Sequence, residues 1–287
     1  MSSRLLILTL TLLTGGLTSC SDKKKLEIRA KGSDTMIQLS TAWAEAYRKV
    51  NPNIQVNAMG GGSGTGIAAL QDGTADICNS SRPIKDEEKA KIKAATGKDV
   101  VEHAVCLDAL AVYTHKANPV TQISIEELQE IWAEGGTITQ WEAVGGTGGQ
   151  ISLIGRQSSS GTYDYFREHI CGKTPEKKQR EFRQGISELV GSNEVVESVS
   201  KTPSAMGYSG MGYKNDKVNW LKVSAKKGGE AVVPGEDAAR SGSYPIARKL
   251  FIYTVGEPTG DIKAFIDWIK GPEGQAIVNK EGFVSLK

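Results

Sequence analysis

Two kinds of hydrophobic pattern alternate along the chain from residue 26 almost to the C-terminus. Short apolar or alternating runs predict strands, and segments with apolar residues every three or four positions predict helices. This alternation is typical of an α/β protein with mainly parallel sheets. The expected strands are residues 26–30, 54–59, 100–114, 151–156, 218–223, 249–255 and 283–286. The expected helices are residues 36–50, 67–70, 85–95, 124 onward, 160–170, 175–184, 191–201, 260–270 and 273–280.

The two longest apolar strands indicate how the chain is divided. Segments near 105–114 and 248–255 fit two hinge crossings between lobes. We therefore expect residues 26–110 plus 249–287 to form lobe 1 and residues 111–248 to form lobe 2. Residues 100–114 can also be read as two strands joined near Leu107 and Asp108. Turns are expected at Pro203 and over 207–212.

Residues 155–166 carry the first sign of a binding site. The strand that ends there is followed by Arg156, three serines, Gly161 and Thr162, and then by an amphipathic helix. Serine is a good N-cap, so the helix is expected to begin near Ser160. The first N–H groups of a helix lack partners within it, and its dipole favours negative charge there. Hydroxyl donors and one guanidinium make this place suited to a phosphate-like oxyanion. The alternative is a capped helix after a polar loop.

Two upstream segments repeat the order of strand, polar turn and helix. Residues 60–66 form a glycine-rich turn that includes Ser63, and residues 32–35 form a turn that ends at Thr35. Glycines allow backbone N–H groups to approach a ligand closely. All three turns are rich in Gly, Ser and Thr and poor in lysine, so together they favour an anion site.

The amino terminus has the pattern of an export signal. Met1–Arg4 is a short cationic start, and residues 5–13 are apolar but too few to span a bilayer. Small residues before Cys20 resemble the bacterial lipobox, which implies a signal peptide over 1–19 and a lipid on Cys20, with residues 20–25 as a tether. An ordinary signal peptide with an incidental cysteine is the alternative. The lipid would hold the protein on a bacterial membrane outside the cytoplasm, in the periplasm or on the outer face of the cell membrane.

Charge and cysteine content narrow the classes of function. The 35 basic and 33 acidic residues nearly balance, and no basic block occurs, so nucleic-acid binding has little support. Three cysteines remain after the anchor, and their spacing matches no zinc pattern. We expect Cys78, Cys106 and Cys171 to be free and buried. No cofactor or metal is expected.

Several motifs together resemble the phosphate-binding proteins of bacterial ABC importers, the PstS type. The resemblance covers nearly the whole mature chain. It rests on Arg156 with Ser160-Gly161-Thr162, and on residues 32–36, 62–64, 76–83, 205–208, 244–248, 271–275 and 282–284. It implies a two-lobed type II periplasmic binding protein fold, with mainly parallel sheets and two crossover strands. It also implies a monomer that binds inorganic phosphate between its lobes and delivers it to the permease of an ABC importer in the membrane.

The resemblance assigns the site residues by motif. From the first lobe it implies Thr35, the backbone of Met36, Ser63 and Ser81. From the second lobe it implies Arg156, Ser160, Gly161 and Thr162, with Arg156 supplying the positive charge.

The chain departs from many relatives at two positions. Ser158 stands where an acidic residue often orients the arginine, and Ser81 stands where the enterobacterial type has an aspartate. A buried carboxylate rejects an oxyanion that lacks a proton, and a serine discriminates less. Asp34 or Asp76 could supply the missing acceptor, although Asp76 can equally cap a turn. Arg82 could bind the ligand or form an interlobe or surface ion pair. Sulfate, molybdate and arsenate therefore remain alternative ligands.

Two other classes of function are alternatives to a phosphate-binding protein. An enzyme is the main alternative, but there is no Gly-x-Ser-x-Gly elbow and no P-loop lysine. His103, His115 and His169 are expected to be surface or packing residues, and His169 is too far from Ser160 to act as its base. A lobe pair used for protein interaction or adhesion is the third possibility, and the intact motif from Arg156 to Thr162 argues against it.

Overall fold

The computed structural model describes residues 26–176 and 178–286. The predicted signal peptide, residues 1–19, and the predicted tether, residues 20–25 with Cys20, lie outside the described residues. Within the described ranges, no helix combines the length and apolar character that crossing a membrane requires.

Strands and helices alternate along most of the chain. The strands are β1 (Leu26–Gly32), β2 (Ile54–Met59), β3 (Ile77–Ser80), β4 (Val100–His115), β5 (Gln122–Ser124), β6 (Ser152–Arg156), β7 (Ser187–Leu189), β8 (Ala205–Gly210), β9 (Val218–Trp220), β10 (Lys222–Ser224) and β11 (Ala247–Val255). The α-helices are α1 (Ile37–Val50), α2 (Ser63–Gln71), α3 (Asp86–Thr96), α4 (Ile125–Trp132), α5 (Gly161–Phe166), α6 (Ser192–Lys201), α7 (Glu236–Ser241), α8 (Gly260–Lys270) and α9 (Pro272–Lys280). Short helical turns are η1 (Asp34–Met36), η2 (Trp141–Val144), η3 (Arg167–Cys171) and η4 (Met211–Tyr213).

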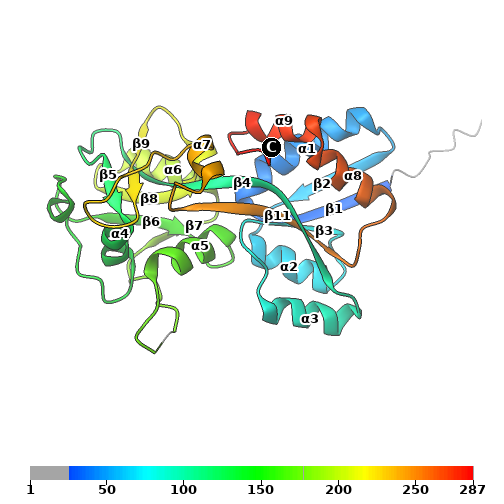
Figure 1. Cartoon of the computed structure of the whole chain (residues 1–287), viewed down its shortest axis with the longest axis horizontal. Helices are drawn as coiled ribbons and strands as arrows, with labels where there is room; N and C mark the ends of the chain where they lie inside the picture. Colours follow the sequence, from blue (N-terminus) through cyan, green and yellow to red (C-terminus); the bar gives the residue numbers. More distant parts are fainter. Residues whose placement is uncertain (1–25, 177, 287) are drawn as a thin grey trace, which may run out of the picture.

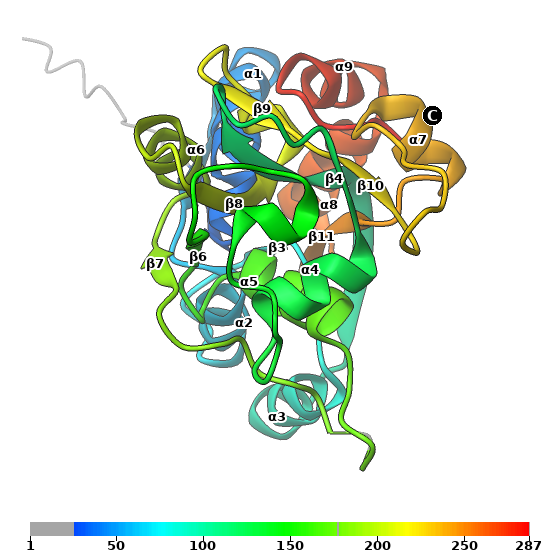
Figure 2. The ribbon, with the colours of Figure 1, turned by 90° about the vertical axis from the view of Figure 1, so that its left-hand side faces the viewer.

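The elements form two lobes, which confirms the predicted fold class (Figure 1). The first lobe contains β1–β3 with α1, α8 and α9 on one side and α2 and α3 on the other. The second contains β5–β10 and α4–α7, and Figure 2 shows it from its outer end. Sheet pairing is parallel within each lobe, where β1 joins β2 and β3, and β6 joins β7 and β8.

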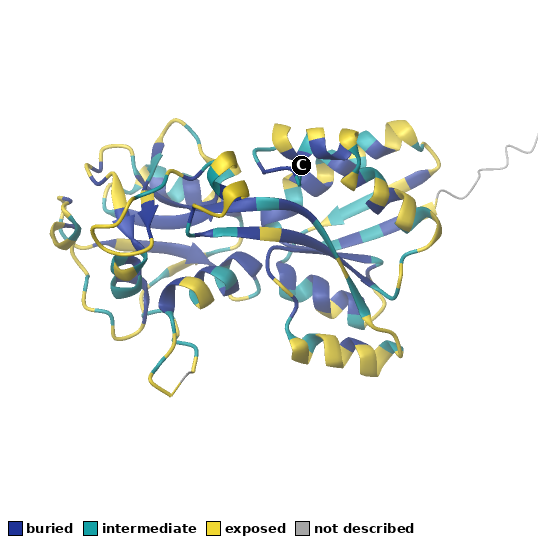
Figure 3. Cartoon of the chain, in the orientation of Figure 1, coloured by how far each residue is buried: buried dark blue, intermediate teal, exposed yellow. Residues whose placement is uncertain are grey.

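β4 and β11 connect the lobes. They pair antiparallel from Ala247 beside Ala109 to Val255 beside Val100, and beyond Ala109 strand β4 pairs with β8 instead. The sheet therefore runs through both lobes in the order β2-β1-β3-β11-β4-β8-β6-β7. Residues 100–115 form one strand and not two. Both connecting strands are buried along most of their length (Figure 3).

Four local predictions differ from the structure. Residues 175–184 form no helix in the described part, because this segment instead pairs Phe182 with Ala133 in an isolated bridge. The expected turn at 207–212 is strand β8 as far as Gly210. Residues 218–223 are divided between β9 and β10, and the C-terminal strand is reduced to one bridge at Val284.

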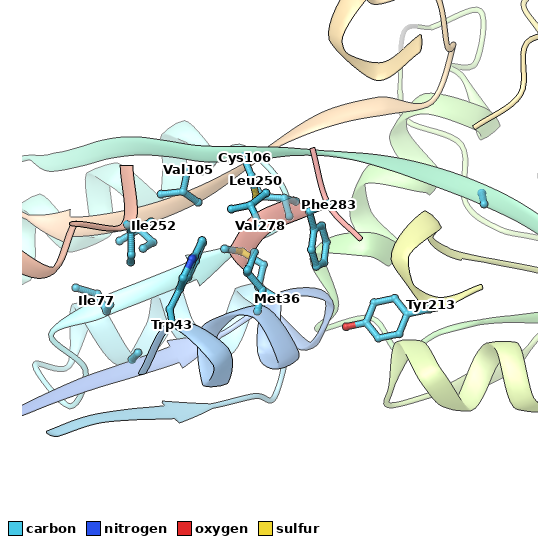
Figure 4. Packing of buried hydrophobic residues seen from close by; sticks show 14 of the residues in the cluster. Met36, Trp43, Ile77, Val105, Cys106, Tyr213, Leu250, Ile252, Val278 and Phe283 are labelled. Atoms are coloured by element: carbon cyan, nitrogen blue, oxygen red, sulfur yellow. The ribbon is translucent and has the colours of Figure 1, made fainter. Parts of the chain in front are cut away.

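Apolar side chains from α1, α9 and the connecting strands form a continuous core. Met36, Trp43 and Val278 pack beneath β4 and β11 (Figure 4). Tyr213 reaches this region from the second lobe, and its hydroxyl donates to the Thr35 carbonyl at 2.7 Å. Each lobe interior is therefore connected to the boundary between the lobes. The described cysteines, Cys78, Cys106 and Cys171, are free and buried, as predicted.

Candidate anion-binding site

Four strand ends meet between the lobes. The carboxyl ends of β1, β2 and β3 lie at the boundary on the side of the first lobe, and the carboxyl end of β6 lies there on the side of the second. Parallel strands place these ends at the same edge of a sheet, where ligands of open α/β sheets bind. The Gly64 N–H donates across the boundary to the Ser159 carbonyl at 3.3 Å. The predicted turns therefore face one another.

Buried hydroxyl groups from both lobes gather at this meeting point. The Thr35 and Thr162 hydroxyls form a hydrogen bond across the boundary. The Ser63 hydroxyl lies 3.4 Å from that of Ser81. Gly161 lies against this serine pair, because an added Cβ would overlap the Ser63 hydroxyl and lie 2.6 Å from that of Ser81. The structure thus brings five predicted residues into one cluster.

Two of the serine hydroxyls already accept hydrogen bonds from backbone N–H groups. Ser160 caps α5, and its hydroxyl oxygen accepts from the N–H groups of Thr162 at 3.1 Å and Tyr163 at 3.4 Å. The Ser63 hydroxyl oxygen accepts from the Ser81 N–H at 3.1 Å. A hydroxyl has one proton and two lone pairs, so a hydroxyl that already accepts is well placed to donate. Both groups suit the oxygens of an anion.

The Arg156 guanidinium is fully buried at the end of β6. It donates to Ser192 Oγ at 2.7 Å, the Val190 carbonyl at 2.6 Å and Asp34 Oδ2 at 3.1 Å. These bonds use three of its five N–H groups, and its buried Nε has no hydrogen-bond partner in the described part. Burial lowers the pKa of Arg156, and the charge of Asp34 opposes that effect. A buried cation with spare donors is well suited to an oxyanion.

Met36 lies at the site through its backbone only. Its side chain is buried in the core of the first lobe. Its N–H donates to the Ser33 carbonyl at 3.1 Å, within the turn η1. An anion at this turn would share that N–H with Ser33.

The three residues left open by the sequence lie in different places. Asp34 is at the site and binds Arg156 from the opposite lobe, so it has the orienting role that exposed Ser158 does not fill. Asp76 lies away from it and accepts from the backbone and side chain of Arg29 in β1.

Arg82 forms an ion pair between the lobes. This agrees with the predicted ion-pair role and not with the predicted ligand contact. Its Nε lies 2.8 Å from an oxygen of Asp164 in α5, and its other nitrogens bind Glu88 in α3. These contacts occupy the guanidinium at the rim of the lobe boundary.

Arg248 was missed as a site residue by sequence reasoning. It lies in β11 and donates to the Ser81 carbonyl at 2.8 Å and to Thr162 Oγ1 at 3.0 Å. Its ion partner is Asp108 in β4. The sequence did contain a signal for this pair. Asp108 and Arg248 are opposite charges within two long apolar strands that were both expected to cross between the lobes.

The described histidines lie apart from the site hydroxyls. His103 binds Thr254, His115 accepts from the Ala117 N–H, and His169 stacks on Tyr165. In the residues that the structure describes, no cluster of histidine, cysteine and carboxylate side chains could hold a metal ion.

Comparison with known proteins agrees with this geometry. Residues 18–273 match the family model described as a PBP superfamily domain. The phosphate-binding protein PstS of Pseudomonas aeruginosa is 34% identical over 269 residues, covering 89% of this chain and 81% of the relative. PstS of Bacillus subtilis is 34% identical over 277 residues, covering 93% of this chain and 85% of the relative.

A solved structure has the same architecture. It is a putative phosphate ABC transporter substrate-binding protein with bound phosphate from Clostridium perfringens, with a TM-score of 0.79 and 30% identity. The match covers 91% of this chain and 100% of that chain. Sequence and fold agree across nearly the entire chain, and the protein therefore belongs to the PstS family of phosphate-binding proteins within the PBP superfamily.

Proposed function

We propose that this protein captures inorganic phosphate between its lobes and delivers it to an ABC importer. The observation that carries the proposal is the convergence of donors from both lobes on one buried place. The Thr35 and Thr162 hydroxyls meet across the boundary, Ser63 lies beside Ser81, Ser160 caps the helix that contains Thr162, and Arg156 reaches Asp34, the neighbour of Thr35. Relatives that share this fold are named as phosphate-binding proteins.

The donor set fits a tetrahedral ion that has lost its water. Uncharged donors replace the hydration shell, and one guanidinium with spare N–H groups offsets part of the charge. Hydrogen bonds are stronger in such a low-dielectric place than in water. Because Thr35 and Ser63 belong to one lobe and Arg156 and Thr162 to the other, closing the lobes would complete the site and opening them would release the ion.

The second part of the proposal concerns where the protein works in the cell. We infer an extracytoplasmic lipoprotein held to a bacterial membrane through Cys20, acting as a monomer and without catalysis of its own. The permease of the importer would accept the closed form, because a partner shifts a conformational balance only through differential binding. Relatives named PstS are binding proteins and not enzymes, which supports this role.

Another oxyanion is the second candidate, and Ser81 is the reason for it. No carboxylate stands at that position to accept the proton of hydrogen phosphate. Asp34 lies nearby, but Oδ2 accepts from Arg156 and Oδ1 accepts from the Gly61 N–H at 2.7 Å. To favour hydrogen phosphate over sulfate, an oxygen of Asp34 would have to accept the proton of the ligand in addition to the bond that it already accepts.

Isothermal titration with phosphate, arsenate, sulfate and molybdate tests the proposal. We expect phosphate to bind most tightly and Arg156→Ala to weaken it by about 100-fold or more, since charge-assisted hydrogen bonds contribute about 1.5–3 kcal/mol each. Arg29→Ala is the matched control, because Arg29 also pairs with an aspartate but lies away from the site. Phosphate affinity that is unchanged in Arg156→Ala would exclude this site.

A further inference from the structure

A buried ion pair joins the two connecting strands beside the site. Arg248 and Asp108 are register partners in β11 and β4. Their side chains are 1% and 0% exposed, and both Nε and Nη2 of Arg248 donate to Asp108 Oδ2, at 3.1 and 2.9 Å. Removing two charges from water costs free energy. A buried pair offsets that cost only when further hydrogen bonds satisfy its remaining donors and acceptors.

The remaining donors of Arg248 reach both lobes. Nη1 donates to the Ser81 carbonyl at 2.8 Å and to the Gly161 carbonyl at 3.3 Å, and Nη2 donates to Thr162 Oγ1 at 3.0 Å. Ser81 follows β3 of the first lobe, whereas Gly161 and Thr162 begin α5 of the second. With the two bonds to Asp108, all five N–H groups of the guanidinium are used. Arg248 therefore has no donor to offer a ligand without breaking one of these bonds, in contrast to Arg156.

The bond to Thr162 decides which way that hydroxyl acts. Arginine can only donate, so Thr162 Oγ1 must accept from Arg248. The single proton of Thr162 is then directed elsewhere, and in this structure its hydroxyl meets that of Thr35 across the boundary. When an anion lies between the lobes, the same proton is available to one of its oxygens.

We propose that Arg248, held by Asp108, is a positioning residue of the anion site. It fixes the Thr162 hydroxyl as a donor toward the anion, and it ties the Ser81 turn to the start of α5 when the lobes are closed. This inference rests on the proposed function. Because Asp108 neutralises Arg248, the residue orients the site without adding net charge to it.

Titration of phosphate into four full-length variants tests the inference. Arg248→Lys keeps the charge opposite Asp108 but cannot make five bonds in a planar fork, and we expect it to weaken phosphate binding about 10-fold. Thr162→Val removes the hydroxyl, and we expect a similar loss. Because Arg248 acts through Thr162, the double variant should bind much more tightly than the product of the single losses predicts. Arg29→Met, which removes an arginine that pairs with Asp76, should leave phosphate affinity unchanged.

A purely structural role would give a different result. It would lower the melting temperature of Arg248→Lys, but its effect on affinity would multiply with that of Thr162→Val. If Arg248→Lys does not fold, Arg248→Met with Asp108→Asn removes both charges together and takes its place in the cycle. Wild-type affinity in the folded Arg248 variant, or losses that simply multiply, would overturn the inference. A wild-type protein that binds no phosphate would instead overturn the proposed function.

Discussion

At the residue scale, the site contains a position where even a methyl group would overlap neighbouring side chains. Gly161 is buried between Ser63 and Ser81, which belong to the opposite lobe. A methyl group there would overlap one hydroxyl and crowd the other. The obstruction would fall between the lobes and not within either core, so it opposes closure more than folding.

We expect Gly161→Ala to weaken phosphate binding by about 10-fold or more, because overpacking a closed contact costs about 1–3 kcal/mol. Thermal unfolding without phosphate should change little. The measurements are isothermal titration and circular dichroism melting.

Gly64→Ala provides the control. Gly64 lies in α2 at the same boundary, but a Cβ there would meet only the Ser159 carbonyl, at an ordinary 3.7 Å. Alanine is also the better helix former. Equal losses of affinity in both variants would contradict a specific role for Gly161.

The two buried arginines of the site show how far sequence reasoning reaches. Arg156 was found because it lies between a strand and a serine-rich turn, so its neighbours in the chain are also its neighbours in the site. Arg248 was not, because its partner Asp108 lies 140 positions away. The ion pair between Asp34 and Arg156 spans 122 positions, so a pattern within a short stretch of sequence does not predict it either.

At the element scale, the local helix propensity of the sequence predicted most helices. It failed where contacts between residues distant in the chain determine the structure. The capping pattern of Ser124 and Glu127 begins α4 as predicted. Residues 175–184 contain good helix formers, but Phe182 packs its ring against Trp132 and Tyr163, and the backbone bridges Ala133. This tertiary contact overrides helix propensity.

The glycines of residues 207–212 predict a turn, whereas the structure has strand β8 as far as Gly210. Gly207 instead allows α6 to pack closely, since a Cβ there would lie 2.8 Å from Val199 and 3.0 Å from Val195. Such a reason is visible only once the helix and the strand are in place.

The start of α3 carries a pH-dependent contribution to stability. Burial would raise the pKa of Glu88, but hydrogen bonds from the Arg82 side chain and the Lys85 N–H outweigh it and lower this pKa below its usual 4.5. A carboxylate with a depressed folded-state pKa stabilises the protein above its unfolded pKa. That contribution is lost as the pH falls below about 4.5 through the folded-state pKa.

We therefore expect Glu88→Gln to be less stable than wild type at pH 7, with the difference shrinking as the pH falls below about 4.5. The free energy of unfolding from urea titrations at several pH values measures it. Glu87→Gln, an exposed neighbour in the same turn, is the control. A difference independent of pH would rule out this ion pair as the cause.

At the scale of the whole molecule, charged contacts span the boundary between the lobes. Asp164 in α5 lies 2.8 Å from Arg82 and 3.5 Å from Lys85, both of the first lobe. The Asp164 side chain is 12% exposed, so salt screens these contacts only in part. They exist only while the lobes are together, and they stabilise the closed arrangement.

Asp164→Asn should weaken phosphate binding by about 10-fold at low salt, a value between those of exposed and buried ion pairs. The deficit should shrink as salt is added, because wild type loses more of its interlobe attraction than the variant. Titrations at low and high salt measure it. Glu181→Gln removes an ion partner of Arg167 within the second lobe and should leave affinity unchanged. A deficit of the same size at all salt concentrations would argue against interlobe attraction.

The 16-residue strand β4 changes its pairing partner between Ala109 and Leu110, from β11 to β8. Backbone pairing thus follows β4 from the first lobe into the second, with one register shift between Leu250 and Phe251 of β11, and no loose linker separates the lobes at this strand. Relative rotation of the lobes must be absorbed as a twist of paired strands, spread over several residues near that exchange. Such a joint restricts the direction of movement, so the two halves of the site return to the same alignment each time they meet.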